Sequence, residues 1–121
     1  MGPEELMIAD RDYVRLVPLA GEGALADELE RATVIPLERM PQEVVRMHSR
    51  VTYDIEGSTA LRQVQLVYPD EADPAAGKVS VLAPVGAALL GLQEGQTIDW
   101  PFFPDGRLRR LRVVRAEPPT A

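Results

Sequence analysis

The residue types that could support catalysis are few, and the adjacent pair His48 and Ser49 is the first of them. A serine nucleophile needs a base within hydrogen-bonding reach and usually a third group that orients the base. No third member stands out near this pair, so catalysis is not expected. The chain has no cysteine and one histidine, which excludes thiolate and multi-histidine zinc sites. We therefore expect a protein that is not an enzyme, with no cofactor and no bound metal.

Acidic side chains offer a different chemistry, the binding of a basic surface. Asp70, Glu71 and Asp73 stand in a loop over residues 69–77, and Glu22 stands between two glycines. Such a loop can be a solvated turn, but loops on a rigid scaffold also carry much of the binding in proteins.

The charge distribution restricts the class of partner. Residues 1–44 carry a net charge of −6 and residues 45–121 carry none, so the excess acid lies in the first third. That argues against binding to phosphate backbones, which needs lysine and arginine. It suits either a basic protein surface or simple solubility.

Two further groups have alternative interpretations. Trp100, Phe102 and Phe103 could line an apolar pocket of the prolyl-isomerase kind, or they could pack in the core and its turns. The arginines of residues 107–112 could touch nucleic acid, but the zero net charge of this part of the chain favours a solvated face.

The first third of the chain predicts two short helices joined by a glycine turn. The first covers residues 10–17, with Asp10 as its N-cap and Leu16 on its apolar side, and Pro18 ends it. The second covers residues 24–32. Short helices of this length are marginal alone and must pack on something.

The second helix has a clear apolar side. Leu25 and Leu29, four residues apart, are expected to face inward. Its acidic side chains are expected to face water: Asp27, Glu28 and Glu30. The proline-containing connector over residues 33–41 then suggests a division into a helical part, 1–41, and a second part, 42–121.

After residue 42 the apolar pattern takes the period of a strand. Strands are predicted over residues 50–55, 63–68, 78–82, 97–100 and 107–115. A helix is predicted over 84–90, with Gly91 in a left-handed conformation after it. The last strand alternates imperfectly, which indicates a bulge or a partly covered edge.

One nearly uncharged segment is expected to form the centre of this part. Residues 79–92 have no ionisable side chain, and Leu89, Leu90 and Leu92 should be buried. The expected fold class is α+β, a bent antiparallel sheet wrapped on one helix and preceded by a short helical hairpin.

Three stretches within residues 44–116 carry a family resemblance: VVRMHSRVTY, QVQLVYPDEADPAAGKVSVLAPVGAALLGLQEGQTIDWP and GRLRRLRV. They resemble the C-terminal domain of the Gre-type transcription elongation factors, and more closely the branch named for regulation of nucleoside diphosphate kinase. The resemblance implies an FKBP-like C-terminal domain. It also implies docking on bacterial RNA polymerase at the rim of the secondary channel, through the acidic loop with Asp70, Glu71 and Asp73 and the turn with Ala83, Pro84 and Val85.

The resemblance has one large departure in the N-terminal part. Gre-type factors reach the polymerase active site with a long coiled coil whose acidic tip helps to hold a magnesium ion. Here each helix would span only about 14 Å at 1.5 Å per residue. The turn between the helices holds one acid, Glu22, as the candidate residue at the tip. Stimulation of transcript cleavage is therefore not expected, and the shortened hairpin suits the regulator branch.

The sequence thus predicts a regulator of transcription elongation that binds RNA polymerase and competes with longer Gre-type factors. The expected form is a cytoplasmic monomer with no membrane segment and no sequence-specific nucleic-acid contact; no signal peptide is indicated. Two alternatives stay open. One is an FKBP-like peptidyl-prolyl isomerase, and the other is an interaction module with a different protein partner.

Overall fold

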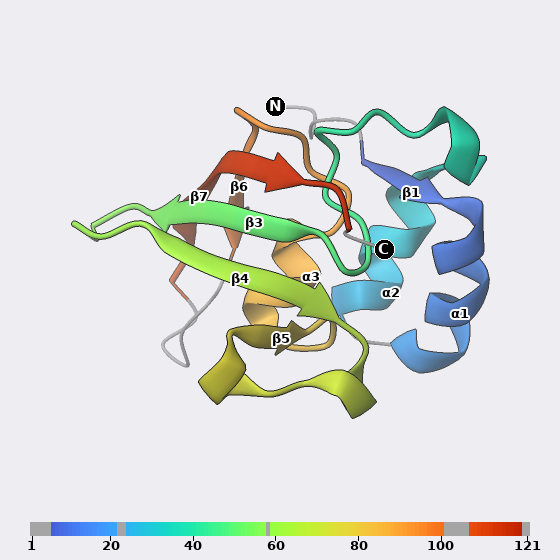
Figure 1. The fold of residues 1–121 in the computed structure, drawn as a ribbon, viewed down its shortest axis with the longest axis horizontal. Helices are drawn as coiled ribbons and strands as arrows, with labels where there is room; N and C mark the ends of the chain where they lie inside the picture. Colours follow the sequence, from blue (N-terminus) through green and yellow to red (C-terminus); the bar gives the residue numbers. More distant parts are fainter. Residues whose placement is uncertain (1–5, 22–23, 58, 101–106, 120–121) are drawn as a thin grey trace.

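The computed structural model describes residues 6–21, 24–57, 59–100 and 107–119. A five-stranded sheet with the strand order β5-β4-β3-β7-β6 forms its centre (Figure 1). The sheet strands are β3 Arg50–Ile55, β4 Arg62–Val67, β5 Lys78–Ser80, β6 Thr97–Trp100 and β7 Arg109–Glu117. The remaining elements are β1 Met7–Ala9, α1 Asp10–Ala20, α2 Ala24–Arg31, β2 Thr33–Ile35 and α3 Pro84–Leu89. Short 3₁₀ turns cover Leu37–Arg39, Pro69–Glu71 and Pro74–Ala76.

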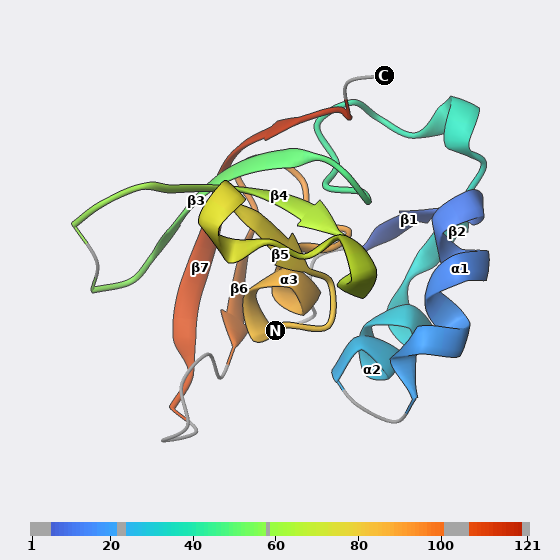
Figure 2. The same ribbon diagram turned by 60° about the horizontal axis from the view of Figure 1, so that its bottom comes forward.

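The sheet is bent, and α3 lies against its inner face (Figure 2). The pairs β3–β4, β3–β7 and β6–β7 are antiparallel, as expected. The pair β4–β5 is parallel, which differs from the antiparallel sheet predicted. The reason is the long connection over residues 69–77. It returns the chain to the end of the sheet where β4 began, so that β5 runs in the same direction as β4. The α+β class with a short helical hairpin is confirmed.

Of the two explanations offered for the imperfect alternation in the last strand, a bulge or a partly covered edge, the structure shows a bulge. Thr52 pairs with Arg115 and Tyr53 pairs with Val113, so Val114 is an extra residue in β7. Leu111 and Val113 are buried before the bulge, and Ala116 is buried after it. Because of this one extra residue, the positions of β7 that face the core shift by one after the bulge.

Residues from the uncharged segment fill the core, as expected: Leu89, Leu90 and Leu92 are buried. Gly91 has φ 84°, the left-handed conformation predicted after the helix. The strand predicted over residues 78–82 is shorter, because β5 ends at Ser80 and the chain then turns into α3.

Two predictions about the first helix are wrong. Pro18 does not end α1, which continues to Ala20. Proline removes the hydrogen bond to the carbonyl four residues earlier and crowds that carbonyl, but it does not prevent the next turn from forming here. That carbonyl belongs to Val14, whose side chain is 72% exposed, so water can reach this side of the helix. Asp10 is also not the N-cap: α1 begins at Asp10 itself, and its carboxylate accepts hydrogen bonds from the amides of Arg11 and Leu37.

The connector predicted over residues 33–41 contains structure that the sequence did not indicate. β2 pairs in parallel with β1, and Val34 lies opposite Ile8. Each strand has three residues, too few to show a period. A pair of this kind depends on contacts between distant segments, so local pattern does not reveal it.

The helical part packs into the same core as the sheet. Leu16, Leu25 and Leu29 belong to one cluster with residues of α3 and of the sheet. The prediction that Glu28 faces water is wrong. Glu28 is 2% exposed and pairs with Arg31. A division at residue 41 remains a prediction about the organisation of the chain. Every helix in the described ranges is too short or too polar to cross a membrane.

Candidate interaction site

Two exposed segments proposed from the sequence meet at one end of the sheet. Because β4 and β5 are parallel, the residues that follow them leave from the same side. Asp70 and Glu71 lie in the 3₁₀ turn after β4, which contacts β5. Ala83 is the N-cap of α3, a few residues after β5. The parallel pairing thus brings together segments that are separated in the sequence.

The residues of the second segment are exposed to different degrees. Pro84 lies in the first turn of α3 and is exposed, whereas Ala83 and Val85 are half-buried. Val85 packs against the hydrophobic core. Pro84 is therefore the member of this group with the freest surface.

Two other candidate residues lie elsewhere. Asp73 pairs with Lys78 through two backbone hydrogen bonds of 3.0 Å, which places it beside the amino end of β5. Glu22, proposed at the tip of the hairpin, lies outside the described residues.

Glu71 stabilises the turn that carries Asp70. One of its oxygens, Oε1, accepts a hydrogen bond from the Tyr68 amide at 3.1 Å and lies 2.8 Å from His48 Nε2. The hydrogen bond from the His48 ring lowers the pKa of Glu71, so its charged form is favoured. The carboxylate of Asp70, by contrast, makes no ion pair or hydrogen bond with any described residue. Of Asp70 and Glu71, Asp70 is therefore the acid available to a partner.

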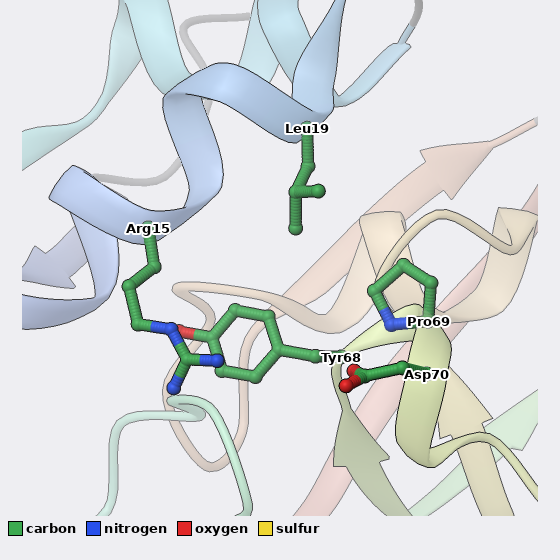
Figure 3. A pocket seen from close by; sticks show the side chains of 5 residues that line it. All are labelled: Arg15, Leu19, Tyr68, Pro69 and Asp70. Atoms are coloured by element: carbon green, nitrogen blue, oxygen red, sulfur yellow. The ribbon is translucent and has the colours of Figure 1, made fainter.

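An open pocket of about 390 Å³ separates this turn from α1. Arg15 and Leu19 reach from α1 toward Tyr68, Pro69 and Asp70, which form the other side (Figure 3). The guanidinium carbon of Arg15 lies 3.9 Å from the centre of the Tyr68 ring. At this distance the cation is attracted to the face of the ring.

Sequence reasoning missed Arg15 and Tyr68 as members of the site. A weak signal existed on the helix, because Asp12, Arg15 and Leu19 follow each other at steps of three and four residues and share one face. Nothing in the sequence showed that this face would lie against Tyr68.

Further contacts join α1 to the segment before β3. Asp12 Oδ2 accepts a hydrogen bond from the Met47 amide at 3.2 Å. Burial raises the pKa of Asp12 and raises the pKa of Tyr68 to about 12. The His48 ring meets the Tyr68 ring edge-on at 5.7 Å, and His48 has a φ of 71°. The helical hairpin is thus fixed to the sheet by polar contacts as well as by the core.

His48 and Ser49 are not arranged as a base and a nucleophile. The Ser49 hydroxyl is buried and accepts a hydrogen bond from the Arg46 amide at 2.9 Å. The His48 ring is directed to Glu71 instead. Within the described ranges no three His, Cys, Asp or Glu side chains gather where they could hold a metal ion.

The arginine-rich strand forms ion pairs on the sheet surface. Arg110 pairs with Asp99 at 3.2 Å and Arg112 pairs with Asp54 at 3.0 Å. Trp100 is half-buried, and Phe102 and Phe103, proposed with it as pocket residues, lie outside the described residues.

Comparison with known proteins identifies the family. The family model described as transcription elongation factor, GreA/GreB, C-terminal, matches residues 40–118. The chain belongs to this GreA/GreB family. The match includes both exposed segments, the turn with Asp70 and the turn with Pro84.

Individual relatives of this GreA/GreB-family chain agree with the assignment. It is 43% identical over 94 residues to the regulator of nucleoside diphosphate kinase of Escherichia coli K12, covering 78% of this chain and 68% of that protein. It is 33% identical over 75 residues to the elongation factor GreA of Azorhizobium caulinodans, covering 62% of this chain and 48% of GreA. The chain thus aligns with about half of that factor's length.

A solved structure of the same family supports the fold over nearly the whole chain. The GreA/GreB elongation factor from Nitrosomonas europaea has a TM-score of 0.73 and 39% sequence identity. The alignment covers 94% of this chain and 98% of that one. The likeness therefore extends beyond the family match, into the helical part.

Proposed function

We propose that this protein regulates transcription elongation by binding bacterial RNA polymerase, without stimulating transcript cleavage. Membership of the GreA/GreB family supports a role like that of an elongation factor. The observation that carries the proposal is the exposed end of the β4–β5 pair within the family match. There, Asp70 offers a free carboxylate and Pro84 offers an exposed apolar ring. Acidic and apolar groups together suit a basic protein surface with apolar side chains.

The partner surface that we propose is the rim of the polymerase secondary channel. A monomer would dock there through the turns containing Asp70 and Pro84. Occupancy of the rim would exclude longer factors that use the same place, because two proteins cannot occupy one surface. Regulation would then follow from competition and would need no chemical step.

The helical hairpin supports the absence of cleavage stimulation. α1 has 11 residues and α2 has 8. At 1.5 Å per residue they are about 16 Å and 12 Å long. Their apolar residues Leu16, Leu25 and Leu29 are already buried in the core of the molecule. A hairpin that is short and packed in this way has little length left to reach a distant active site.

A binding and competition assay with purified bacterial RNA polymerase tests the proposal. The full chain should bind the core enzyme and reduce binding of a labelled GreA in proportion to its own occupancy. Absence of binding at micromolar concentration, with circular dichroism showing a folded chain, would refute the polymerase-binding proposal. A parallel cleavage assay on stalled elongation complexes should show no stimulation above the factor-free rate.

Asp70→Lys tests the docking face. This charge reversal should weaken polymerase binding about fivefold or more, since one exposed ion pair is worth up to about 1 kcal/mol and repulsion adds to its loss. Glu30→Lys is the matched control, because Glu30 is equally an exposed acid but lies on α2. Equal affinity of both variants and the parent would show that the turn with Asp70 is not the contact. Asp70 is preferred to Glu71 because Glu71 also stabilises the turn.

A further inference from the structure

A second pocket, of about 220 Å³, opens beside the amino end of β5, away from the turns with Asp70 and Pro84. Its polar lining residues are Arg50, Gln63, Gln65 and Lys78. Val64, Ala76 and Gly77 complete the wall. No acidic side chain of the described residues lines this pocket, although the chain as a whole carries a net charge of −6.

The strand register places the polar groups in a row. Gln65 of β4 lies opposite Arg50 of β3 on one side and opposite Lys78 of β5 on the other. Directly opposite residues project from the same face of a sheet. This is the face away from the core, because the neighbouring Val51 and Leu66 are the buried residues. With strands about 4.8 Å apart, the two cationic residues stand about 10 Å apart with the amide between them.

The cationic side chains in this row form no ion pair within the part of the chain that the structure describes. Neither Arg50 nor Lys78 forms a side-chain ion pair or hydrogen bond with another described residue. The Gln65 amide nitrogen donates to the His48 carbonyl at 3.2 Å, which fixes that side chain. An amide nitrogen carries two hydrogens, so one donor remains.

Two carboxylates stand beside the row, and neither forms an ion pair with Arg50 or Lys78. Glu117 lies opposite Arg50 on β7, and its carboxylate lies 3.8 Å from Arg115. Asp73 lies opposite Lys78 and is joined to it through backbone hydrogen bonds. Neither acid lines the pocket. The pocket therefore collects hydrogen-bond donors and positive charge, and no acidic residue of the described ranges lines it.

We propose that this pocket binds the oxyanion of a small molecule, a phosphate or carboxylate group held between Arg50 and Lys78. A guanidinium presents two parallel donors to such a group, and an ammonium adds a compact positive charge. The amides of Gln63 and Gln65 supply neutral donors between the cations. The site is independent of polymerase docking, since the two surfaces lie at opposite ends of β5.

Titration of the full-length ¹⁵N-labelled chain with inorganic phosphate, followed by NMR at constant ionic strength, tests the proposal. Saturable shifts are expected at the side-chain amides of Gln63 and Gln65 and at the backbone amide of Lys78. Arg50→Gln and Lys78→Gln should each weaken binding about fivefold, and the double variant about 25-fold. Arg110→Gln is the matched control, because Arg110 lies on the same face of the sheet but already pairs with Asp99. The affinity of this control variant for phosphate should equal that of the parent.

A second arm identifies the source of the oxyanion. Citrate in place of phosphate, binding more tightly at the same residues, would support the site and assign it to carboxylates. Non-saturable shifts that spread over the surface arginines, or equal affinity of the parent and the double variant, would overturn the proposal. A single-stranded oligonucleotide that binds these residues far more tightly than phosphate and citrate would also overturn it, in favour of a nucleic-acid surface.

Discussion

Alanine in place of Gly86 is expected to destabilise the fold, although Gly86 lies within α3. Alanine is a better helix former than glycine by about 1 kcal/mol, so propensity alone predicts a gain in stability. The packing of α3 on the end of β5 predicts the opposite. A Cβ atom at residue 86 would lie 2.1 Å from the carbonyl oxygen of Ser80 and 2.9 Å from its carbonyl carbon.

The size of the effect follows from what must move. The atoms in the way belong to the backbone, so no side-chain rotation relieves the contact. The helix or the segment after β5 must shift, and overpacking of this kind costs about 3 kcal/mol at the upper end of its usual range. After the gain in propensity, the net loss is about 2 kcal/mol. For a chain of this length, that corresponds to a fall in Tm of about 6–12 °C.

Urea and thermal denaturation followed by circular dichroism measure this loss. Ala88→Gly, the reverse change two residues later in the same helix, is the matched control. It should cost about 1–2 kcal/mol through propensity and one lost methyl group. NMR shifts in the Gly86→Ala variant should extend to Ser80 and Val81. A Gly86→Ala variant as stable as the parent, or more stable, would refute the close approach of α3 to the end of β5.

Two further substitutions test buried polar groups. Burial raises the pKa of Glu28 above its ordinary value of 4.5, so the stability that its protonated form contributes is lost as pH rises through the folded-state pKa. Glu28→Gln should therefore be more stable than the parent at pH 7, and the difference should shrink as the pH falls below 4.5 in urea denaturation; a larger gain in acid than at neutral pH would contradict this. The hydroxyl of Tyr68 is buried and has no hydrogen-bond partner among the described residues, so Tyr68→Phe should leave the free energy of unfolding unchanged or raise it by about 1 kcal/mol. A loss of more than about 1 kcal/mol in Tyr68→Phe would show that this hydroxyl is satisfied.

Much of the sheet and its helix could be predicted from the sequence because their signals are local. The alternation at Val51 and Tyr53 marked β3, and Gly91 marked the end of the helical segment. The imperfect alternation in β7 was also visible, and the structure decides that a bulge rather than a partly covered edge causes it. The stretches that showed the family resemblance also lie in this part of the chain, and the family match confirms them.

The sequence therefore determined the fold class, the buried α3 segment and the two exposed turns. Only the tertiary structure decided that β4 and β5 run parallel, and this pairing is what brings those turns together. It also decided that Glu28 is buried and that Arg15 stacks on Tyr68. Each of these depends on a neighbour far away in the chain, whereas residue type and spacing report only on the local backbone and its two faces.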